Sequence, residues 1–122
     1  MWREHIDVAV LQGQILTKVE KIGDDSILFE TATGEKYEMY HEQDCCEHVY
    51  IESIVGDLED LVGSPILMAE EVTNIDEPPT SELEESYTWT FYKFATNKGY
   101  VTIRWYGSSN GYYSESVSFS EA

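Results

Sequence analysis

The chain has 122 residues, 42% of them hydrophobic, which fits a single domain over residues 1–122 and argues against disorder throughout. Its 24 acids and seven lysines and arginines give a net charge of −17, which disfavours direct binding to nucleic acids or anionic membranes and favours basic partners. The N-terminal stretch "MWREHIDVAVLQGQ" lacks the apolar run of a signal peptide, and no segment is long enough to span a membrane. We therefore expect a soluble cytoplasmic protein.

The first third of the chain predicts three short strands joined by tight turns. Residues 14–22 are rich in β-branched and apolar side chains, although Ile15, Val19 and Ile22 would also fit one face of a helix. The segments that follow, 26–32 and 36–42, alternate in polarity between turn signals, which favours a meander of strands.

The middle of the chain predicts a strand over 49–55, then one or two helical turns over 56–63, then a strand over 65–72. Asp57 is a candidate N-cap of the helix, and Gly63 is a candidate end. Residues 73–85 contain two prolines and several acids without apolar periodicity, which predicts an exposed acidic loop.

The last third predicts three strands over 86–95, 99–107 and 111–119, separated by short turns. In the middle strand, Val101, Ile103 and Trp105 should face the core. The fold class is therefore mainly β, with antiparallel meanders and hairpins and one short helix. Three arrangements remain open: a small sandwich, a half-open barrel or one strongly bent sheet.

The stretch "YHEQDCCEHVY", residues 40–50, is the candidate for chemistry. Zinc prefers cysteine and histidine, so its candidate ligands are His41, Cys45, Cys46 and His48. Adjacent residues of a strand point to opposite faces, however, so the two cysteines could share a metal only if the backbone turns there. The alternative is a bend between two strands, with one cysteine in the core and Glu42, Asp44 and Glu47 facing outward.

The other hypothesis for this stretch is a catalytic thiol, with His41 or His48 as the general base that deprotonates it. The neighbouring acids would raise the pKa of a thiol, and no oxyanion-hole glycines lie nearby. A disulfide between adjacent cysteines is rare and the cytosol is reducing, so we expect two thiols. We expect no enzymatic activity and no cofactor other than the candidate zinc.

The C-terminal strands are rich in tyrosine and tryptophan, whose rings could stack on bases. Only Lys93, Lys98 and Arg104 accompany them, which is too little positive charge for a nucleic-acid groove. We expect these rings to serve mostly as core and cross-strand pairs, with a ligand-binding aromatic patch as the alternative.

Four motifs resemble a family of short acidic proteins encoded by bacteriophages and prophages: HEQDCCE (41–47), GDLEDLVGSPIL (56–67), YTWTFYKF (87–94) and GYVTIRWYGSSNGYYS (99–114). The resemblance covers about two thirds of the chain. It implies a small phage domain in an uncharacterised family, and it brings no activity, cofactor or assigned site.

The charge pattern supplies the leading hypothesis of function. From residue 37 to residue 92 there are fifteen acids and no lysine or arginine. We expect a non-enzymatic protein that imitates a phosphate backbone and blocks a host defence or nucleic-acid-handling protein with a basic surface. Two alternatives stay open: a metal- or small-ligand-binding domain, and a structural or morphogenesis component of the phage. The candidate partner-binding residues are Glu42, Asp44, Glu47, Asp57, Glu59, Asp60, Asp76, Glu77, Glu82, Glu84 and Glu85.

Overall fold

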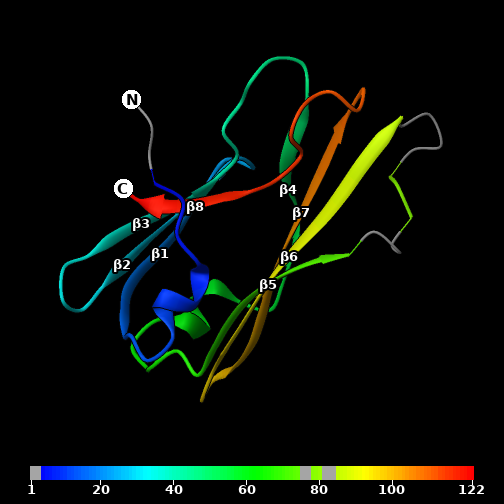
Figure 1. The fold of residues 1–122 in the computed structure, drawn as a ribbon. Coiled ribbons are helices and arrows are strands. Elements are labelled where there is room, and N and C mark those ends of the chain that lie inside the picture. Colours follow the sequence, from blue (N-terminus) through cyan, green and yellow to red (C-terminus); the bar gives the residue numbers. More distant parts are fainter. Residues whose placement is uncertain (1–3, 75–77, 81–84) are drawn as a thin grey trace.

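The computed structural model describes residues 4–74, 78–80 and 85–122, and it confirms a mainly β fold. Within these residues, eight strands form two antiparallel sheets of four strands each, and two 3-10 helices accompany them (Figure 1). No helix among these described residues is long and apolar enough to cross a membrane.

The first sheet has the strand order β1-β2-β3-β8. Its first three strands form the predicted meander, and the last strand of the chain pairs with β3 so that Met39 lies opposite Phe119. The strands are β1 (Leu16–Ile22), β2 (Ser26–Thr31), β3 (Lys36–Tyr40) and β8 (Ser118–Glu121).

The second sheet has the strand order β4-β7-β6-β5, which is a Greek-key arrangement. The β6–β7 hairpin pairs without interruption from Ser86↔Ser109 to Thr96↔Gly99, and β4 pairs with β7 with a bulge between Ile51 and Ser53. The strands are β4 (His48–Val55), β5 (Met68–Asn74), β6 (Ser86–Thr96) and β7 (Gly99–Ser109).

The inner faces of the two sheets enclose one apolar core, so the protein is a β-sandwich and not a barrel. Val101, Ile103 and Trp105 are buried there, as the alternation along their strand predicts. Trp105 also connects the two sheets, since its indole Nε1 donates to Sδ of Met39 on β3 at 3.3 Å.

The segment 56–63, predicted to form one or two helical turns, contains one short helical element. Only η2 (Leu58–Leu61) is helical, and it is a 3-10 turn. Asp57 caps it as predicted, because its carboxylate accepts a hydrogen bond from the backbone N–H of Glu59. Gly56 and Gly63 both have positive φ, of 96° and 89°, and these two turns leave no room for a longer helix. A second 3-10 turn, η1 (Val8–Leu11), was not predicted.

The predicted strand over 111–119 is wrong over most of its length, because only its end contributes to β8. The preceding residues fold back over the hairpin, where the Glu115 carboxylate accepts hydrogen bonds from the hydroxyls of Thr88 and Ser109. Gly107 permits this approach, since a Cβ there would lie 2.7 Å from the backbone oxygen of Glu115. The strand predicted over 65–72 also begins later, at Met68.

The packing of Trp105 predicts a large effect of truncation. We expect Trp105→Ala to lower the free energy of unfolding by about 3–5 kcal/mol, because it removes a fully buried ring from the contact between the sheets. Tyr100→Ala on the same strand is the matched control: this side chain is 77% exposed, so its change should stay within about 0.5 kcal/mol. Urea unfolding followed by circular dichroism measures both, and equal effects would contradict the assigned core.

Candidate functional site in the loop before β4

The loop of residues 41–47 carries the chain from β3 in the first sheet to β4 in the second. In Figure 1 it lies in the teal connection at the top of the view. It contains no regular secondary structure, so its backbone donors need partners from side chains or solvent.

Glu47 supplies those partners from the inside of the loop. Its side chain has no exposed surface, and each carboxylate oxygen accepts two hydrogen bonds. Oε2 accepts from the backbone N–H of Asp44 and from Nε2 of His41, both at 2.8 Å. Oε1 accepts from the backbone N–H of Cys45 at 2.9 Å and from Nε2 of Gln43 at 3.2 Å. The prediction that Glu47 faces outward is therefore wrong.

These contacts determine the charge of Glu47. Burial by itself raises the pKa of the carboxyl group, but the hydrogen bonds from the backbone of Cys45 and Asp44 and from His41 outweigh burial and lower the pKa to about 2. Glu47 is therefore ionised at neutral pH, although it is one of the most enclosed side chains of the loop.

His41 joins this loop to the C-terminal segment. Its Nδ1 lies 2.7 Å from the backbone oxygen of Ser116, and its Nε2 lies 2.8 Å from Oε2 of Glu47. His41 therefore connects the buried carboxylate of Glu47 to the backbone of the C-terminal segment and anchors the loop to that segment.

Two predictions about the cysteines, that one lies in the core and that both are thiols, are wrong. Neither enters the core, since Cys45 and Cys46 are both exposed. They are also not thiols here, because a disulfide joins them. The backbone bends at this pair, which is the one condition under which the two neighbouring sulfurs could lie on the same side.

The four candidate zinc ligands do not come together. His41 uses both ring nitrogens within the protein, and the ring of His48 packs against Tyr50 with centroids 4.6 Å apart. Within residues 4–74, 78–80 and 85–122, no group of three or more His, Cys, Asp or Glu side chains forms an arrangement that could hold a metal ion.

The candidate partner-binding acids lie in separate places. Glu42 and Asp44 are exposed in the loop at one end of β4, whereas Asp57, Glu59 and the half-buried Asp60 lie around η2 at the other end. Eight residues of strand separate these groups by about 25 Å. Glu85 is exposed before β6. The remaining candidates, Asp76, Glu77, Glu82 and Glu84, lie outside the described residues.

Most aromatic side chains of the β6–β7 hairpin are buried or half-buried, whereas Tyr100 is exposed. On the outer face of the second sheet Trp89 and Tyr106 pack edge to face, with ring centroids 4.7 Å apart, and Arg104 lies over the Trp89 ring at 4.9 Å. Pro78 and Thr80 cover part of this cluster through hydrogen bonds to the Trp89 indole and the Tyr106 hydroxyl. Trp89 is 5% and Tyr106 1% exposed, so these two rings offer little surface for stacking on a ligand.

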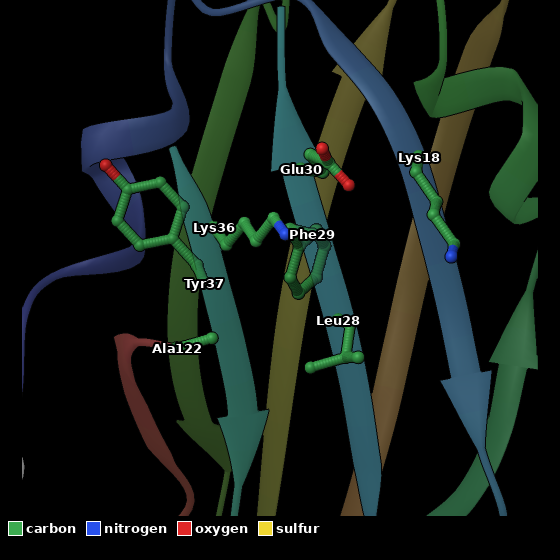
Figure 2. Close-up of a pocket in the computed structure, with 7 residues that line it drawn as sticks. All are labelled: Lys18, Leu28, Phe29, Glu30, Lys36, Tyr37 and Ala122. Carbon is green, nitrogen blue, oxygen red and sulfur yellow. The ribbon is translucent and has the colours of Figure 1, made fainter. Parts of the chain in front are cut away.

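A pocket opens elsewhere, on the first sheet. Figure 2 shows that Lys18, Glu30, Lys36 and Tyr37 contribute to it from three neighbouring strands, together with the C-terminal Ala122. Its volume is about 140 Å³, below the roughly 300–1,000 Å³ of most small-molecule sites. None of the site residues predicted from sequence lines it.

The fold and loop define a small antiparallel sandwich with an acidic connection between its sheets. Comparison with family models matches residues 9–119 to the family described as "Domain of unknown function (DUF7448)", and the chain belongs to this family. The search of curated proteins finds no match, and the search of solved structures finds none.

The buried carboxylate predicts a specific acid sensitivity. The folded-state pKa of Glu47 is lowered to about 2, so its contribution to stability is complete above the usual value near 4.5. That contribution is lost as the pH falls through about 2. We expect the free energy of unfolding to decline between these two pH values.

Two variants separate Glu47 from the other acids. Between pH 2 and pH 4.5, the Glu47→Gln variant should take up about one proton fewer on unfolding than the natural chain does. The reason is that the substitution removes the carboxyl group whose pKa is lowered in the folded state. Glu42→Gln, which changes an exposed neighbour, should keep the pH dependence of the natural chain. Urea unfolding at a series of pH values measures both. Identical pH dependence in the natural chain and Glu47→Gln would contradict the assigned hydrogen bonds.

Proposed function

We propose that this protein is non-enzymatic, needs no cofactor and acts by binding a partner with a basic surface. One observation carries the proposal: the stretch from residue 37 to residue 92 holds fifteen acids and no lysine or arginine. This stretch includes all of β4, the edge strand of the second sheet, and all of β5, the opposite edge strand.

The surroundings of β4 support the proposal. Glu52 on β4 lies 3.5 Å from Arg104, but Asp44, Asp57 and Glu59 are exposed and, within the described part of the chain, have no ion pair with lysine or arginine. Carboxylates without nearby cations create a negative field that attracts and orients a basic surface. The distribution of acids from one end of β4 to the other suits an extended partner surface better than a point contact.

A basic surface of this extent is typical of proteins that hold nucleic-acid backbones. We therefore propose a nucleic-acid-handling or defence protein of a bacterial host as the partner, and a phage or prophage protein acting in the host cytoplasm as the setting. A protein of this kind would occupy the partner's groove in place of DNA or RNA without binding nucleic acid itself.

The proposal predicts salt-sensitive binding. Host proteins retained on the immobilised chain should elute between 50 and 300 mM salt, and the affinity of the identified partner should fall at least about tenfold over this range. The partner's nucleic acid should compete with the chain for binding. Affinity that is indifferent to salt, or simultaneous binding of nucleic acid and this chain, would contradict the proposal.

Charge-neutral variants locate the surface. Asp44→Asn combined with Glu59→Gln removes one charge at each end of β4 and should weaken binding about three- to tenfold at low salt. Glu121→Gln on β8 removes an exposed charge from the other sheet and should leave the affinity unchanged. Calorimetric titration with the identified partner measures the affinity of the natural chain, the double variant and Glu121→Gln. Equal weakening by both changes would show that net charge, and not this surface, governs binding.

A further inference from the structure

The cysteine pair lies where small molecules can reach it. Cys45 and Cys46 are both exposed at a bend of the loop, with Cα atoms 3.7 Å apart. A disulfide in the core would be shielded from attack, whereas here solvent has access to both residues. Reactivity in thiol–disulfide exchange depends on such access.

The bend at the pair does not depend on the disulfide alone. The buried Glu47 carboxylate holds the backbone N–H groups of Asp44 and Cys45 at 2.8 and 2.9 Å. Gln43 adds hydrogen bonds to the backbone oxygens of Cys45 and Glu47, at 3.2 and 2.7 Å. These contacts do not involve sulfur, so they persist when the disulfide is reduced. The reduced loop would keep both thiols on one side and present them together.

We propose that the Cys45–Cys46 pair is a thiol–disulfide exchange site that faces solvent and whose reduced form is a preorganised vicinal dithiol. This inference is independent of the proposed binding function. The two cysteines do not belong to any potential metal site in the described part of the chain. The proposal gives them a redox role instead.

The exchange step balances with a small dithiol as reductant. One thiolate of the reductant attacks the sulfur of one cysteine, forming a mixed disulfide and breaking the bond between Cys45 and Cys46. The released cysteine sulfur takes a proton from water. The second thiol of the reductant then displaces the first cysteine and closes a cyclic disulfide. The protein gains two electrons and two protons, and the reductant loses them.

The negative charge around the cysteine pair should make the rate of reduction depend on the charge of the reductant. Glu42 and Asp44 are exposed beside the pair, in a chain of net charge −17. A reductant that carries carboxylates, such as glutathione, is repelled more strongly than an uncharged dithiol such as dithiothreitol. The site should therefore be reduced faster by the uncharged dithiol than by glutathione. Added salt should reduce the difference between the two rates, because it screens the repulsion.

The test uses the full chain without denaturant. Iodoacetamide followed by mass spectrometry should find no modified cysteine in the diamide-treated protein and two after brief treatment with dithiothreitol. Equal concentrations of thiol groups from glutathione should reduce the protein at least about tenfold more slowly at low salt, and this ratio should shrink at 0.5 M salt. Reduction that requires denaturant, or a ratio that salt does not change, would overturn the proposal.

An arsenical probe tests the preorganised dithiol. Phenylarsine oxide condenses with two thiols and releases one water, so it should bind the reduced protein with one-to-one stoichiometry. Cys45→Ser and Cys46→Ser each retain one thiol and should bind the probe at least about tenfold more weakly. Circular dichroism checks that each variant is folded. Equal binding by the natural chain and a folded single-cysteine variant would contradict the proposal, and so would failure of the reduced natural chain to bind.

Discussion

The packing of two sheets against each other is the constraint on which the other features depend. Trp105 from β7 is fully buried and donates its indole N–H to Met39 of β3, so a single side chain is in contact with both layers. Because the chain builds most of the first sheet before it begins the second, residues 41–47 must cross between layers. A crossing loop has no neighbouring strand to satisfy its backbone, and Glu47 takes over that role from within.

The acids of this chain divide into two kinds by environment. Among the described residues, Glu47 and Glu115 are the buried acids, and each accepts hydrogen bonds that fix an irregular segment. Loss of either carboxylate would leave part-buried donors without that partner, which makes both structural. The exposed acids have few such contacts. Their effect is long-ranged and depends on salt, and it bears on association more than on the fold.

The loop before β4 brings these two kinds of acid within a few residues of the cysteine pair. Glu47 shapes the loop from inside, while Glu42 and Asp44 give its outer surface a negative potential. Chemistry at the cysteines and binding at the acidic surface would therefore take place on the same segment. The family match over residues 9–119 includes this loop, strands β1 to β7 and the first two residues of β8.

The sequence by itself determined the elements whose pattern is local. Alternation along 99–107 predicted the buried face of β7, and turn signals between short apolar segments predicted the β1-β2-β3 meander. Asp57 was also predictable as a cap, because a cap acts on backbone groups two or three residues away. These features depend on neighbours in the chain, so the order of residue types contains the necessary information.

Tertiary structure alone decided which distant segments meet. The choice of a sandwich over a barrel or a bent sheet depended on the division of the strands between two sheets, in which strands far apart in the chain pair. One example is β8, which pairs with β3, about eighty residues earlier. Nothing in "HEQDCCE" distinguishes the buried Glu47 from the exposed Glu42 and Asp44, because all three are acids in one short segment. Glu47 is selected by the donors that the folded loop directs at it and by His41, which Ser116 holds from the far end of the chain. A carboxylate can be buried only where such donors converge, and their convergence is a property of the fold.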